Sequence, residues 1–131
     1  MKIRRIIFLL LFCLYIAAVA YMCIARPDSI PSLPESWFGL PADKVAHFLM
    51  FLPYPILGYL AFEGTGAGTR TIAIFLLVFI GSGFAVAATT EYIQANLGYR
   101  SKETFDLLAD IMGVISGGIL TSIYIFIKNR T

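Results

Sequence analysis

The sequence predicts an all-α polytopic membrane protein, with four transmembrane helices in a compact bundle and both termini in the cytoplasm. Composition is the first reason: 59% of the 131 residues are hydrophobic and only 14% are charged, whereas soluble domains carry about 25% charged residues. The second is that the apolar residues fall into four runs of about 20 residues, enough helix to cross roughly 30 Å of hydrocarbon. The third is that proline-rich, glycine-rich or polar segments separate the runs. We expect one membrane domain, 1–131.

The first predicted span covers about residues 6–25 and follows a short basic N-terminus. A cleaved signal peptide is the alternative, because Ala18-Val19-Ala20 forms a weak cleavage motif. The apolar run exceeds the roughly 7–15 residues of a typical signal peptide, so we expect a retained anchor. Cys13 and Cys23 would lie about 15 Å apart on this helix, too far for a disulfide, and we expect both to be buried apolar residues.

The predicted outer loop, 26–41, contains four prolines, which exclude a continuous helix. Trp37 and Phe38 fit the aromatic belt of a membrane interface, so we expect this loop to lie along the membrane surface; a lid over a substrate site is the alternative. The inner turn, 63–70, is glycine-rich but lacks the Gly-Lys-Ser/Thr ending of a phosphate-binding loop, and we expect a simple hairpin turn. A second outer loop covers 94–104.

The second predicted span, 42–62, begins with ionisable residues. Asp43 favours a helix N-terminus, and His47 shares its face because the two are four residues apart. Pro53 and Pro55 fall near the middle of the membrane and should kink the helix and free backbone carbonyls. Most such kinks are architectural, and a broken-helix transport site is the alternative.

The third predicted span, 71–93, is rich in small residues in its second half, which lets membrane helices approach closely. Glu91 and Gln94 project from one side of its far end, because they are three residues apart.

The fourth predicted span, 105–127, carries four residues on one continuous helical face. They are Asp106, Asp110, Gly113 and Gly117. Two acids therefore precede a G-x-x-x-G strip, a spacing that favours close helix packing.

Four spans place both termini on the same side of the membrane. Basic residues on that side are Lys2, Arg4, Arg5, Arg70, Lys128 and Arg130, and those on the other side are Arg26, Lys44, Arg100 and Lys102. This bias favours cytoplasmic termini. The polar residues at the rim then converge on the outer leaflet: Asp43, Lys44, His47, Glu91, Gln94, Arg100, Asp106 and Asp110.

These acids require partners, because a charge at the bilayer centre costs about 2.5–3.5 kcal/mol on insertion scales and less near the interface. The available partners are Arg100, Lys44 and His47. A structural salt-bridge cluster is one interpretation. An outward-facing binding or catalytic pocket is the other, and ionisable residues within a membrane suggest function by default.

Together these motifs resemble the VanZ-like family. The resemblance rests on Asp43-Lys44-x-x-His47-Phe48, Glu91-x-x-Gln94, Arg100 and Asp106-x-x-x-Asp110-x-x-Gly113-x-x-x-Gly117, in that order, across roughly residues 27–120. It implies a small multi-pass protein of the bacterial plasma membrane, in a family named for a member associated with teicoplanin (glycopeptide) resistance. The family supplies no established reaction, and its pattern often has Asn at the position of Asp110.

Two classes of function fit these residues. In the first, the polar pocket binds an anionic lipid head group, a lipid-linked wall precursor or a partner protein, with Lys44 and Arg100 contacting phosphate or carboxylate and the acids and Gln94 orienting them. In the second, the protein is a membrane-embedded hydrolase or transferase whose catalytic candidates are His47, Glu91 and Asp106, with Asp43 or Asp106 holding the histidine.

Other possibilities are weaker. A metal site of His47, Glu91, Asp106 and Asp110 is an allowed ligand set, but no compact ligand motif is present, and we expect neither a metal nor another cofactor. A small transporter hinged at the prolines is a further alternative. The scattered basic residues predict no nucleic-acid partner.

Overall fold

A computed structural model describes residues 2–25, 33–62, 68–98 and 104–130. In these ranges the chain forms five helices and one small sheet. The elements are α1 (Lys2–Ile24), β1 (Ser36–Trp37), β2 (Leu40–Pro41), α2 (Ala42–Phe51), α3 (Pro53–Phe62), α4 (Thr69–Asn96) and α5 (Thr104–Arg130). With α2 and α3 counted as one stretch, four helices are long and apolar enough to cross a membrane. The predicted helical fold with four candidate spans is therefore confirmed.

The second of these stretches is divided at Leu52, directly before the first of its two prolines. Pro53 and Pro55 have no N–H to donate, so the hydrogen-bond ladder is interrupted there. Leu52 itself keeps α-helical dihedral angles (φ −54°, ψ −43°), and its N–H donates to the Phe48 carbonyl over 3.0 Å. The chain therefore passes from α2 into α3 without a loop.

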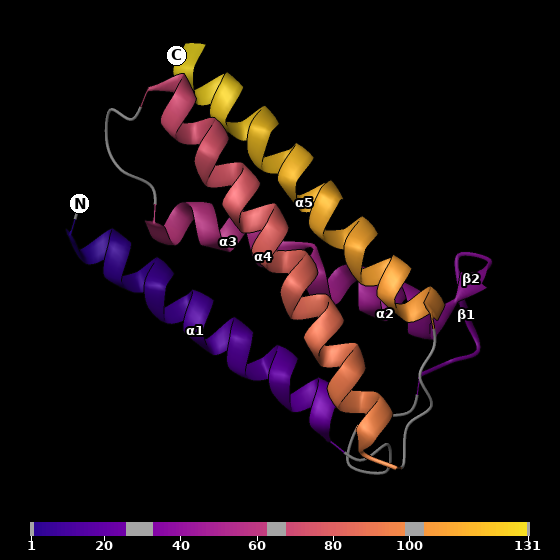
Figure 1. Cartoon of the computed structure of the whole chain (residues 1–131). Coiled ribbons are helices and arrows are strands. Elements are labelled where there is room, and N and C mark those ends of the chain that lie inside the picture. Colours follow the sequence, from indigo (N-terminus) through magenta and orange to yellow (C-terminus); the bar gives the residue numbers. More distant parts are fainter. Residues whose placement is uncertain (1, 26–32, 63–67, 99–103, 131) are drawn as a thin grey trace.

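Helix α5 packs against α2, α3 and α4, and α1 packs against α3 and α4 (Figure 1). Helix α3 contacts each of the other four helices. Gly113 and Gly117 of α5 face the backbone of the α2–α3 junction. A Cβ at Gly113 would collide with the Phe48 carbonyl oxygen, and one at Gly117 with the Leu52 carbonyl oxygen. Only glycine allows this approach, which brings the first turns of α5 against α2.

A β-hairpin between α1 and α2 was not predicted. Ser36 pairs with Pro41 and Trp37 with Leu40, in antiparallel register. The two turn residues, Phe38 (φ 53°) and Gly39 (φ 77°), both have positive φ, as a type I′ turn requires. Phenylalanine seldom adopts this conformation, and its side chain here is 99% exposed.

The bundle surface is strongly apolar. Large hydrophobic side chains are exposed along α1, α4 and α5, whereas the buried core is small and includes Phe51, Ala87 and Val114. Cys23 is buried but Cys13 is exposed, so the expectation that both are buried is wrong for Cys13. Cys13 therefore lies on the side of α1 that faces away from the other helices, which a lipid chain would contact if α1 spans a membrane.

Candidate functional site

Three helices bring ionisable side chains together at one end of the bundle. The N-terminal turns of α2, the last turns of α4 and the first turns of α5 meet there, away from the end at which the two termini lie (Figure 1). We call this group the polar cluster; its described members are Asp43, Lys44, His47, Glu91, Asp106 and Asp110.

His47 pairs with the buried acid Asp110. Its Nδ1 lies 2.8 Å from Oδ1 of Asp110, whose side chain is 0% exposed. With Asp110 ionised, Nδ1 carries the proton and its N–H donates a hydrogen bond to the carboxylate. The other ring nitrogen, Nε2, lies 3.6 Å from Oδ2 of Asp106. The pair with Asp110 therefore fixes the ring and turns Nε2 toward the neighbouring acids.

Lys44 joins two of the acids. Its Nζ lies 2.6 Å from Oδ2 of Asp43 and also donates to Oδ1 of Asp106. Asp106 thus uses its two oxygens for different partners, one for Lys44 and the other for His47. This arrangement ties the first turn of α2 to the first turn of α5.

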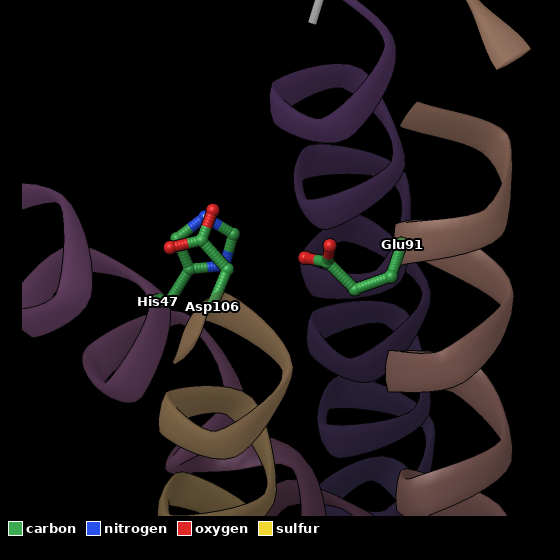
Figure 2. Close-up of side chains that lie close together, drawn as sticks. All are labelled: His47, Glu91 and Asp106. Atoms are coloured by element: carbon green, nitrogen blue, oxygen red, sulfur yellow. The ribbon is translucent and has the colours of Figure 1, made fainter. Parts of the chain in front are cut away.

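Glu91 completes the cluster from α4. It is only 3% exposed, and its carboxylate points across the gap between helices toward His47 and Asp106 (Figure 2). One ligand-type atom from each of Glu91, His47 and Asp106 lies within 4.8 Å of the others. The structure therefore brings together the three residues predicted as catalytic candidates.

Carboxylates outnumber cations in the described part of the cluster. Four acids surround one ammonium group and one imidazole. In addition, Oδ2 of Asp110 is buried and has no hydrogen-bond partner among the described residues. A buried carboxylate oxygen without a donor is costly, so among the described residues the hydrogen bonding of Asp110 is incomplete.

The other predicted site residues have separate positions. Gln94 is buried on α4, one turn beyond Glu91. Arg100 lies outside the described residues, so its expected role as a partner of the acids is untested. Gly113 and Gly117 lie on the packing face described above. The acid that holds His47 is Asp110, whereas Asp43 or Asp106 was expected, because the close approach of α5 to α2 brings Asp110 level with the histidine.

Sequence reasoning missed a groove at the opposite end of the bundle. Its volume is about 360 Å³, and it lies between α1, α3 and α5, with Arg4, Tyr59 and Tyr124 among its lining residues. These residues carry no motif, and only the three-dimensional packing brings them together. The lining of the groove is mostly apolar, and none of its residues belongs to the polar cluster.

No protein-family model matches the chain, and neither a curated protein nor a solved structure matches it.

Proposed function

We propose that this chain is a VanZ-like multi-pass protein of the bacterial cell membrane that binds the polar head group of an anionic lipid or lipid-linked wall precursor at the polar cluster. One observation supports this most. Polar residues of α2, α4 and α5 gather at one end of an otherwise apolar bundle, although paired residues lie up to 63 positions apart in the sequence, as His47 and Asp110 do. Gathering charged groups in this way has a desolvation cost, and a bundle held by apolar packing alone would avoid it.

The proposed orientation has cytoplasmic termini and an outward-facing polar cluster. Its support is the distribution of basic residues among the described positions. The start of α1, the start of α4 and the end of α5 lie at the end of the bundle opposite the polar cluster (Figure 1). These helix ends carry Lys2, Arg4, Arg5, Arg70, Lys128 and Arg130. Basic residues favour the cytoplasmic side, so the polar cluster would face the cell wall.

Lys44 is the described cation through which an anionic head group would bind. It lies between Asp106, which is mostly buried, and Asp43, whose side chain is 52% exposed. A phosphate oxygen that reaches the ammonium group would replace the exposed Asp43 carboxylate, while the contact with Asp106 keeps the lysine in position. An ammonium group binds phosphate as a point charge, without the bidentate geometry of arginine.

Lipid retention tests this proposal. The full chain, purified in detergent, is offered phosphatidylglycerol, a polyprenyl phosphate or phosphatidylcholine, and bound lipid is counted by native mass spectrometry. We expect retention of the two anionic lipids and about tenfold weaker retention by Lys44→Met, the loss of one charge-assisted contact. Lys128→Met, at the opposite end of the bundle, is the matched control and should bind as the wild type does. Equal retention by the Lys44 variant and the wild type would refute the proposal.

A second candidate function is hydrolysis of the head group, and the buried His47–Asp110 pair favours it. Nε2 of His47 would take a proton from water as the water oxygen bonds to the phosphorus or carbonyl carbon. The bond to the leaving oxygen then breaks, and that oxygen receives the proton from the imidazolium.

Turnover of a labelled phospholipid or polyprenyl diphosphate separates this candidate from simple binding. His47→Gln should lower turnover by about 10²–10⁴-fold, the usual contribution of a general base. Glu35→Gln, an exposed acid outside the cluster, should not change it. No turnover by the wild type would leave binding as the function.

A further inference from the structure

We propose that the polar cluster holds a divalent metal ion, bound by Nε2 of His47 and by the carboxylates of Glu91 and Asp106. The evidence for the site is the geometry of these three residues. The role that we give the ion, bridging an anionic head group to an acidic cluster, rests on the function proposed above.

The donor atoms are close to the spacing of a metal site. One from each residue lies within 4.8 Å of the others, and ligand atoms around a tetrahedral zinc ion are roughly 3.3–3.5 Å apart, given bonds of about 2.0–2.2 Å. The glutamate side chain has three rotatable bonds, and its carboxylate already points toward the other two residues (Figure 2). A small inward movement of Glu91 would close the site.

Asp110 has the role of an orienting partner. Metal-bound histidines almost always donate the other ring N–H to a carboxylate, carbonyl or water. Nδ1 of His47 makes this contact with Asp110 over 2.8 Å, which leaves Nε2 for an ion. The two oxygens of Asp106 also have different roles. Oδ1 accepts a hydrogen bond from Lys44, and Oδ2 faces the histidine and would bind the ion.

Buried carboxylates lie beside the proposed ligands. Glu91 and Asp110 are almost completely buried, and Oδ2 of Asp110 has no donor within the described ranges. A divalent ion at Nε2 of His47 would place positive charge next to these carboxylates. The Asp110 oxygen is therefore an observation separate from the donor spacing that fits a bound cation.

The donor set indicates which ions fit. One imidazole nitrogen with two carboxylate oxygens suits Zn²⁺ or Mn²⁺ better than Ca²⁺, which prefers oxygen donors alone. Three protein ligands also leave a coordination position open, as in catalytic zinc sites. A phosphate oxygen at that position would be bound by the ion and by Lys44 together. If the protein is a hydrolase, the ion would activate the water in place of the imidazole. Nε2 of His47 cannot bind the ion and accept a proton from water at the same time.

Binding of the metal alone tests the site without any lipid. The full chain is stripped with chelator, titrated with Zn²⁺ or with Co²⁺, whose visible absorption reports coordination by protein, and the bound metal is counted by mass spectrometry. We expect one ion per chain. Glu91→Gln and Asp106→Asn should lose it, and Asp110→Asn should weaken affinity by about 10–100-fold, as loss of an orienting partner does. Glu35→Gln should bind as the wild type does.

The outcomes separate the site from the proposed function. A wild-type protein that binds no stoichiometric metal, or ligand variants that bind as well as the wild type (an adventitious ion only), would overturn the metal site even if anionic lipid is retained. Stoichiometric metal that Glu91→Gln abolishes would support the site even if no lipid binds. Helix content by circular dichroism shows that each variant is folded, and His47→Gln supplies a third ligand variant.

Discussion

The two halves of the bundle are held together by different chemistry. In the half nearer the termini, aromatic rings pack edge-to-face or tilted: Phe79 contacts Phe75 (centroids 4.6 Å apart), Phe62 and Phe12. In the other half, charged side chains of α2, α4 and α5 meet. Apolar packing tolerates substitution of similar volume, whereas buried charges carry a desolvation cost and depend on geometry. We infer that the aromatic half supplies stability and the polar half supplies function.

The largest effect is expected at the junction of the two halves. Gly117→Ala would place a methyl group against the Leu52 carbonyl oxygen and the ring of Pro55. Because backbone cannot move aside cheaply, we expect a loss of about 3 kcal/mol, the upper end of the usual range for overpacking. Gly81→Ala, on α4, is the matched control, since a Cβ there meets nothing within 4 Å. Thermal unfolding in detergent should separate the two variants clearly.

The next effect concerns the polar half. His47→Leu would remove the partner of a fully buried Asp110, and we expect a loss of about 1–3 kcal/mol for the group left unsatisfied. The double variant His47→Leu/Asp110→Leu replaces both polar groups and should recover most of this stability. It should nevertheless bind neither metal nor anionic lipid. A double variant less stable than the single one would contradict the division between stability and function.

A smaller effect is expected in the aromatic half. Phe79→Leu would remove ring contacts with Phe12, Tyr54, Phe62 and Phe75 but keep an apolar side chain. We expect a loss of about 1 kcal/mol, since an aromatic pair contributes about 0.5–1.5 kcal/mol beyond its buried area. Metal affinity should be unchanged. A shift in metal affinity would show that the two halves are coupled.

The smallest effect is expected for Tyr15→Phe. The Tyr15 hydroxyl donates to the Met50 carbonyl oxygen in the turn before the break at Leu52. Its loss should cost about 0.5 kcal/mol, the lower end of the net value of one hydrogen bond, because the pair is only partly buried. Thermal unfolding of the variant and the wild type side by side measures this loss of stability. An unchanged unfolding midpoint would show that water or another donor replaces the hydroxyl.

Much of the fold follows from composition and local pattern. The four apolar runs predict the helices, and Pro53 predicts the break at Leu52 because a residue without an N–H cannot continue the ladder. The β-hairpin could not be predicted in the same way. Its turn has Phe38 with positive φ, a conformation for which the expected signal is Asn or Gly.

The described members of the polar cluster are all among the residues predicted from the sequence, but the pairing of His47 with Asp110 was not predicted. The role expected for Arg100 stays a prediction, because Arg100 lies outside the described residues. The order of the spans places Asp43, Glu91 and Asp106 at the same end of the bundle. The choice of Asp110 as partner of His47 depends on the rotation of α5 against α2. The contact between Gly113 and the Phe48 carbonyl oxygen sets that rotation, because Phe48 follows the histidine and Gly113 lies one turn after the aspartate. The rotation of one helix against another depends on such contacts between helices, and the local periodicity of the sequence does not encode it.

The most direct test is retention of phosphatidylglycerol by the full chain with Zn²⁺ and with chelator, for the wild type and Asp106→Asn. We expect Zn²⁺ to increase retention by the wild type and chelator to reduce it, with little response in the variant, because the ion would link the acidic cluster to the phosphate. Retention that is the same in all four measurements would contradict a metal-bridged head-group site at the polar cluster.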